Sequence, residues 1–148
     1  MPQTEPARVV ARYRDGRVMK GHTRNFDANR SMFGLALLES PPEEEPLVVR
    51  LSDLKAVFFV KSFAGNRDYD ERKEFVAAFT GRRLAVRFSD GEVLVGTSFN
   101  YSPSAAGFFL FPADQSSNND KVFVVAAAVA EVVKLQPGAN REAMTPLS

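Results

Sequence analysis

The chain has 148 residues, and its 45% hydrophobic content with 13 phenylalanines is enough for a packed core. A formal net charge of +1 provides no global field that would attract nucleic acid or an anionic membrane, and the absence of cysteine excludes disulfides and thiolate metal ligands. The first residues carry no secretory signal pattern and no apolar run approaches the roughly 18 residues of a membrane span, so we expect a folded cytoplasmic protein.

One pattern is written twice along the chain, with a shift of 75 positions. Residues 12–18 align at this shift with residues 87–93, and each run contains an aspartate-glycine step. The same shift pairs Gly21 with Gly96, Asn25 with Asn100, Phe33 with Phe108 and Leu35 with Leu110. Such self-similarity indicates that one supersecondary unit of about 55 residues has been duplicated.

In the first unit, Asp15-Gly16 lies between two alternating runs, which favours a tight hairpin because glycine accepts positive φ without steric cost. Gly21 falls inside the second run, where a glycine indicates a bulge or a sharp bend. A proline-flanked run of three glutamates at residues 43–45 is interpreted as a solvated loop, with a docking site for a basic partner as the alternative. The five strands of this unit are expected at residues 9–14, 17–25, 32–38, 47–51 and 56–60.

Between the two units, residues 68–71 resemble a capping box that opens a helix over residues 71–79, and Gly81 is a natural stop for it. Apolar residues recur at helical spacing in this segment, so we expect the helix to pack on the β-structure and to make the two halves one rigid body. The second unit repeats the strands of the first at residues 84–89, 92–99, 107–111, 122–125 and 131–135.

Five short strands with one turn between the fourth and the fifth predict a small closed barrel, because closure leaves no exposed strand edge. We therefore expect a mainly β fold with two tandem five-stranded small barrels, which arise from the internal repeat and are joined by a short helix. The expected segments are a disordered N-terminus at 1–7, a first barrel at 8–61, a linker with the helix at 62–81, a second barrel at 82–136 and a mobile tail at 137–148.

The stretch from Val10 to Leu37 resembles the first motif of the Sm and Sm-like proteins. That motif has an acidic or amide residue followed by glycine, then a second glycine, then an aspartate. In this chain Asp15-Gly16, Gly21 and Asp27 match the motif. The resemblance implies that both small barrels are Sm-like, and it makes RNA binding on an Sm-like surface one alternative function.

A second resemblance is to PilZ domains, which bind cyclic di-GMP through an arginine pair and a loop of amide and hydroxyl groups. Arg8 and Arg12 match the first element, and Asn29, Ser31 and Gly34 match the second. The resemblance implies a cyclic di-GMP receptor, in which the guanidiniums supply forked donors for phosphate and guanine edges. The other interpretation is that the arginines are surface residues of strands, paired with carboxylates. With the second copy included, the candidate ligand-binding residues are Arg8, Arg12, Asn29, Ser31, Arg83 and Arg87.

Over nearly its full length, the chain resembles members of an uncharacterised bacterial family, a domain of unknown function. The likeness is carried by residues 13–18, 51–60, 70–73 and 107–114. It implies no particular activity.

Phenylalanines come in adjacent runs, so strand alternation cannot bury both members of a pair in one barrel. Those that face outward are expected under the linker helix, against the other barrel, or in an interface between copies, because large aromatic patches are rarely left exposed. The candidate interface residues are Phe58, Phe59, Phe108, Phe109 and Phe111.

The sequence contains no familiar catalytic motif, and His22 has no cysteine or second histidine with which to share a metal, so we expect no enzyme, metal site or cofactor. Asn25 and Asn100 recur at one place in both copies, where bonding to turn backbone is favoured over contact with a ligand. We interpret the chain as a non-enzymatic binding or regulatory module that engages a protein partner or a second copy of itself. PilZ-like binding of a cyclic dinucleotide and Sm-like RNA binding are the alternatives, and no membrane partner is expected.

Overall fold

The computed structural model describes residues 6–41, 43–63, 82–113 and 118–135. Every strand expected from the sequence is present, and the observed ends differ from the expected ones by at most three residues. The elements are β1 (Ala7–Tyr13), β2 (Val18–Thr23), β3 (Met32–Leu37), β4 (Leu47–Arg50), the 3-10 turn η1 (Leu51–Asp53), β5 (Leu54–Val60), β6 (Arg82–Phe88), β7 (Val93–Ser98), β8 (Gly107–Pro112), β9 (Asn119–Val125), the 3-10 turn η2 (Ala126–Ala128) and β10 (Val129–Lys134).

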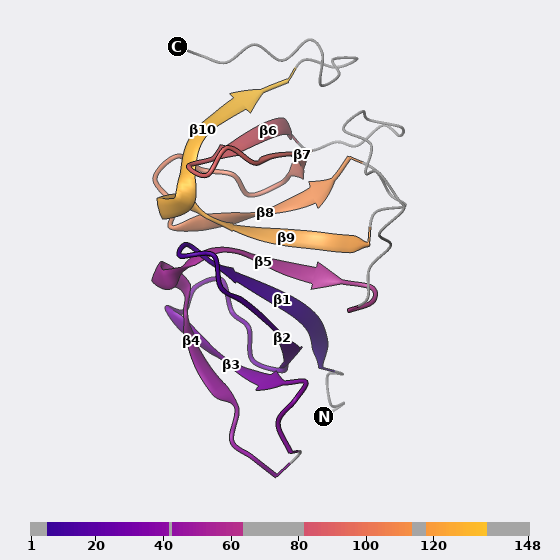
Figure 1. Ribbon diagram of the computed structural model, residues 1–148. Helices are drawn as coiled ribbons and strands as arrows, with labels where there is room; N and C mark the ends of the chain where they lie inside the picture. Colours follow the sequence, from indigo (N-terminus) through magenta and orange to yellow (C-terminus); the bar gives the residue numbers. More distant parts are fainter. Residues whose placement is uncertain (1–5, 42, 64–81, 114–117, 136–148) are drawn as a thin grey trace.

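The ten described strands form one antiparallel sheet in the order β10-β6-β7-β8-β9-β5-β1-β2-β3-β4, so the fold is mainly β as expected (Figure 1). The fifth strand of each unit lies beside its first strand, and the fourth lies at the other end of the unit. The strand pairing does not show two separately closed barrels. The reason is that β5 already pairs with β1 on one side and with β9 of the other unit on the other, so the first unit cannot close through β4. The helix expected at residues 71–79 lies outside the described residues.

The two aspartate-glycine turns have the same backbone conformation. The φ angle is +98° at Gly16 and +95° at Gly91, in a region that residues with side chains rarely adopt. Tyr13 and Phe88, which precede these turns at equivalent positions, each donate their backbone N–H across the turn at 2.8 Å. The duplication seen in the sequence is therefore also a repeat in the structure.

Gly21 and Gly96 mark a close approach between neighbouring strands. A Cβ atom at Gly21 would collide with the backbone carbonyl of Ala36, and one at Gly96 would collide with that of Phe111. Both collisions lie where the second strand of a unit pairs with the third, β2 with β3 and β7 with β8. Glycine is required at these positions because the next strand passes too close for any side chain.

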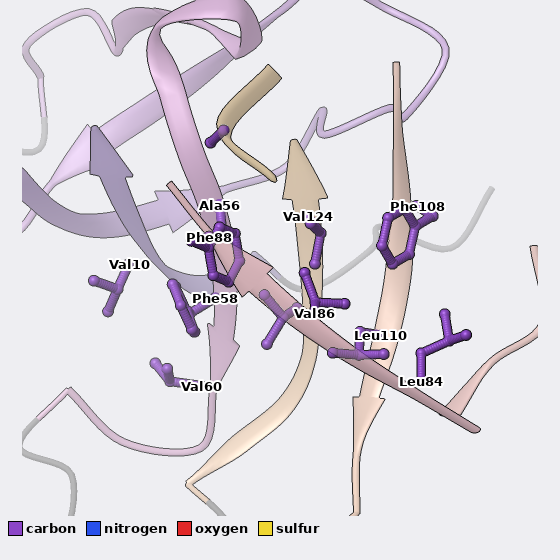
Figure 2. Packing of buried hydrophobic residues seen from close by; sticks show 12 residues of the cluster. Val10, Ala56, Phe58, Val60, Leu84, Val86, Phe88, Phe108, Leu110 and Val124 are labelled. Carbon is purple, nitrogen blue, oxygen red and sulfur yellow. The ribbon is translucent and has the colours of Figure 1, made fainter. Parts of the chain in front are cut away.

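Most of the core lies in two hydrophobic clusters, and each cluster draws side chains from both units. We call them the first and the second cluster, after the unit that supplies most of their residues. β5 is buried along its whole length because its alternate side chains enter different clusters: Phe59 lies in the first cluster and Phe58 in the second. Figure 2 shows Phe58 together with Phe88 and Val124 of the second unit. In return, Phe123 of β9 packs in the cluster of the first unit. The two units therefore share both clusters across the β5–β9 joint.

Candidate interaction surfaces

Arg8 and Arg12 lie on one face of β1, on either side of Val10. The Nη1 atom of Arg8 donates a hydrogen bond to the carbonyl oxygen of Lys61 at 3.1 Å. The guanidinium carbon of Arg12 lies 5.2 Å from the ring centroid of Phe58, which is a cation–π distance. Arg8 thus contacts the residue that follows β5, and Arg12 contacts a ring on β5 itself.

Asn29 and Ser31 lie in the loop between β2 and β3. The backbone N–H of Asn29 donates to Asp27 Oδ1 at 2.9 Å, and the carbonyl oxygen of Ser31 accepts from the backbone N–H of Leu51 at 2.9 Å. Leu51 precedes β5, whereas the partner of Arg8 follows β5, a strand of 7 residues that spans about 20 Å. Arg8 and Ser31 are therefore attached to opposite ends of β5, and the structure does not gather the residues of the PilZ-like pattern in one place.

In the second unit, Arg83 and Arg87 lie on β6. The Nη2 atom of Arg87 lies 3.4 Å from Glu131 Oε1 of the neighbouring strand β10. Arg83 is half-buried, and its carbonyl oxygen accepts a hydrogen bond from the backbone N–H of Leu135 at 2.8 Å. Arg87 therefore forms the kind of surface ion pair that the sequence offered as the alternative to an anion site.

The candidate interface phenylalanines divide into two groups. Phe58, Phe59 and Phe108 are buried in the two shared clusters, and Phe109 packs against the first of them. These four rings fill the interior that joins the two units. Phe111 instead is 37% exposed, and it stacks edge-on with the exposed ring of Phe99 at a centroid distance of 5.7 Å.

Asn25 and Asn100 make the same backbone contacts in their two units. The Oδ1 atom of Asn25 accepts the backbone N–H of Gly34 at 2.9 Å, and that of Asn100 accepts the backbone N–H of Phe109 at 3.1 Å. Each bond holds the loop between the second and third strands against the start of the third strand. Both side chains bond backbone as expected, but the backbone belongs to strands β3 and β8 and not to a turn.

Lys55 is a buried charge that the sequence reading missed. It is 8% exposed on β5, and its Nζ donates to Asp90 Oδ2 at 2.7 Å and to the carboxylate of Glu92, both at the turn of the second unit. The ammonium also lies 4.8 Å from the ring centroid of Phe88. The hydrogen bond from Lys55 is the main cause that lowers the pKa of Asp90 below its ordinary value. The available signal was one lysine inside an otherwise apolar strand.

Within the part of the chain that the structure describes, the sheet ends in two strands that have a neighbouring strand on one side only, β4 and β10 (Figure 1). On β4, the side chains of Leu47 and Val48 are 38% and 64% exposed. On β10, Ala130 and Lys134 are exposed and the other side chains are half-buried. These two strands present the unpaired backbone groups of the described sheet.

A cleft of about 500 Å³ lies beside β4, between the outer face of β2 and β3 and the loop that precedes β4. Its walls combine apolar side chains with two carboxylates and one imidazole. The lining residues are His22, Ala36, Leu37, Leu38, Ser40, Pro41, Glu44, Glu45, Pro46, Leu47 and Val48. The His22 ring also stacks edge-on with Phe63, at a centroid distance of 5.3 Å. The cleft therefore continues the apolar surface of the β4 edge and adds negative charge at one end of it.

Residues 5–136 match the model described as "Family of unknown function (DUF6982)". The chain belongs to this family. The match includes both units and the segment between them. Comparison with curated proteins and with solved structures gives no match.

The described residues contain neither a cluster suited to a metal ion nor a helix suited to span a membrane. No group of three histidine or acidic side chains lies close enough to hold a metal ion in this part of the chain. Over the same residues, no helix has the length and apolar character needed to cross a bilayer.

Proposed function

We propose that this protein is a non-enzymatic interaction module that binds an extended segment of a protein partner along the free edge of β4. One observation carries the proposal. Val48 on β4 is 64% exposed, whereas Phe123, its counterpart in the second unit, is 2% exposed because β5 lies against β9. The same strand position is thus covered by another strand in one unit and open in the other.

Strand addition would use the groups that β4 presents. The edge offers backbone N–H and C=O groups for main-chain hydrogen bonds, and alternate side chains of the added strand would contact Val48 and the cleft. Glu44 and Glu45 lie at the end of the cleft near Pro46 and favour a partner segment with a basic residue there. The preferred ligand is therefore an extended, largely apolar segment with a lysine or arginine at one end.

Binding of a cyclic dinucleotide and of RNA remain predictions from the sequence. No arrangement of the described residues favours either one. The edge of β4 is supported by exposure, shape and charge together, so it is the site that we put forward.

A peptide-display selection tests the proposal. The wild-type protein is expected to select extended apolar peptides with a basic end, and Val48→Lys is expected to weaken their binding about tenfold or more by placing a charge in the contact. Val18→Lys is the matched control, because Val18 is an exposed valine on β2, away from β4. Methylation of alternate peptide amides is expected to abolish binding, since strand addition depends on them.

Failure to select any peptide would contradict the proposal. Equal loss of binding in Val48→Lys and Val18→Lys would also contradict it, because the site would then not be the β4 edge.

A further inference from the structure

We infer that the segment bound at β4 is strand β10 of a second copy of this chain, so that copies associate head to tail. The inference rests on the proposed function and names its partner. It comes from the contact between the two units, where a fifth strand pairs with a fourth strand. Because of the internal repeat, another fifth strand and another fourth strand lie at the two ends of the sheet.

The internal joint pairs β5 of the first unit with β9 of the second. Its register sets Ala56 opposite Val124, Val57 opposite Phe123 and Phe58 opposite Val122. Side chains on both faces of this joint are buried in the two shared clusters. The joint is therefore a packed interface between a fifth strand and a fourth strand.

The two free edges are the same two strand types. A shift of 75 positions converts β5 into β10, and it converts residues 122–125 of β9 into β4. Residues 119–121 of β9, which also pair with β5, correspond to residues 44–46 of the loop before β4. β10 and β4 lie at opposite ends of the sheet, so they cannot meet within one chain (Figure 1). Between copies, the same shift sets Glu131 opposite Val49, Val132 opposite Val48 and Val133 opposite Leu47.

The backbone of β10 is oriented for this pairing. Because the N–H of Leu135 bonds to β6, alternation directs the backbone groups of Glu131 and Val133 to β6 as well. The groups of Val132 and Lys134 then point away from the sheet. Val132 would exchange both of its backbone hydrogen bonds with Val48, whereas Lys134 would only donate its N–H, because Pro46 opposite it has no N–H.

Charge is complementary at one end of the predicted contact, and Glu131 in its middle is already paired with Arg87 of its own chain. The register places Lys134 opposite Pro46, beside the carboxylates of Glu44 and Glu45 in the cleft wall. At the other end, Ala130 is the counterpart of Lys55, which reaches Asp90 and Glu92 in the internal joint. The counterparts of these two residues are Asp15 and Arg17, so a side chain at position 130 would lie near Asp15, Arg17 and Arg50 of the other copy. The basic end that the β4 site favours is thus present on β10.

A contact between unlike edges has a definite consequence for assembly. Each added copy leaves one β4 and one β10 open, so association continues until a ring closes or a filament forms. Sedimentation of the full chain is therefore expected to give a weight-average mass that rises with concentration beyond two chains.

Two single substitutions block one edge each. Val48→Lys places a charge on β4, and Ala130→Arg adds a cation where the other copy already has two, Arg17 and Arg50, against the one carboxylate of Asp15. Each position is exposed, so the fold is expected to persist, and circular dichroism checks this. Each variant alone is expected to sediment as single chains, with association weakened about tenfold or more.

Mixing the two variants gives the decisive test of head-to-tail association. The Val48→Lys chain keeps an intact β10 and the Ala130→Arg chain keeps an intact β4, so a one-to-one mixture is expected to form dimers and nothing larger. The double substitution Arg50→Glu with Ala130→Arg is expected to restore association in one chain. Ala130→Glu alone is expected to tighten association about threefold, because it lies near Arg17 and Arg50. A structural defect would not produce opposite effects at one position.

The inference is overturned if the wild type sediments as single chains at all concentrations, if either variant alone still dimerises, or if the mixture forms no dimer. Peptides that bind the wild type and lose binding in Val48→Lys, combined with a wild type that never self-associates, would remove this inference and leave the proposed function standing. If the wild type neither binds peptides at β4 nor self-associates, both this inference and the proposed function are wrong.

Discussion

β5 and β10 occupy the same position in the two copies of one unit, yet their surroundings differ. All seven residues of β5 are buried, because β9 of the second unit covers its outer side. Among the described strands β10 pairs with β6 alone, and none of its residues is fully buried. The comparison teaches that the fifth strand of each unit can pair on both of its edges. Among the described strands, β5 is paired on both edges and β10 on one.

The same contrast holds for the charges at these strands. Lys55 on β5 is buried and reaches Asp90 and Glu92 of the other unit. Its counterpart on β10 is Ala130, which is exposed. The internal joint thus carries an ionic contact that the free edge lacks, which is consistent with a permanent joint inside the chain and a weaker contact between chains.

The largest expected effect comes from opening the internal joint. Phe123→Ala removes a fully buried ring and is expected to lower the free energy of unfolding by about 3–5 kcal/mol. Val48→Ala, at the equivalent position of the free edge, is expected to change it by at most about 0.5 kcal/mol. Urea unfolding at low protein concentration measures both. Equal losses would show that the two positions are not in different environments.

The next effect concerns the ionic contact of Lys55. Asp90→Asn with Glu92→Gln leaves a buried ammonium without a carboxylate and is expected to destabilise the protein by about 3 kcal/mol. Lys55→Met leaves two exposed carboxylates instead, so its loss is expected to stay below about 1 kcal/mol. Chemical denaturation measures the free energy of unfolding of both variants. A larger loss in Lys55→Met would contradict the assignment of the buried charge to Lys55.

A smaller effect is expected from the repeated asparagines. Asn25→Ala and Asn100→Ala each remove the acceptor for one backbone N–H, and each is expected to lower stability by about 1–2 kcal/mol. Asn25→Asp keeps the acceptor and is expected to retain most of the stability. Thermal unfolding tests this, and a neutral Asn100→Ala would show that the two units do not use the residue alike.

The smallest effect is a pH dependence. Chiefly through the hydrogen bond from Lys55, the pKa of Asp90 is lower in the folded protein than its ordinary value of 3.8. The stabilisation is therefore present above about pH 4 and is lost as the pH falls through the folded pKa. Stability measured between pH 2 and pH 6 is expected to fall less steeply in Lys55→Met than in the wild type. If stability falls equally steeply with pH in both proteins, Lys55 is not the cause of the lowered pKa of Asp90.

Local signals were sufficient to predict the strands and the repeat. The Asp15-Gly16 and Asp90-Gly91 turns require positive φ, and alternation on either side of each turn fixes the strand faces. Both signals act over a few residues, so they can be recognised in the sequence without knowledge of the rest of the fold.

The pairing of β5 with β9 could not be predicted in this way. It joins residues that are 59 to 68 positions apart along the chain, and the apolar sequence of β5 is equally compatible with a closed barrel. Lys55 was missed for the same reason, because its partners Asp90 and Glu92 belong to the other unit. The PilZ-like residues matched in spacing along the chain, but spacing does not determine that Arg8 and Ser31 attach to opposite ends of β5.

The most direct test of a head-to-tail contact uses the absence of native cysteine. Leu47→Cys with Val133→Cys places thiols at a pair that lacks direct hydrogen bonds, where cross-strand Cα atoms lie about 4.5 Å apart and can form a disulfide. The two positions lie at opposite ends of the sheet, so any crosslink joins different chains. Under mild oxidation we expect a ladder of linked multimers, and an out-of-register pair, Arg50→Cys with Val133→Cys, should give little. Only single chains, or equal ladders from both pairs, would contradict the account.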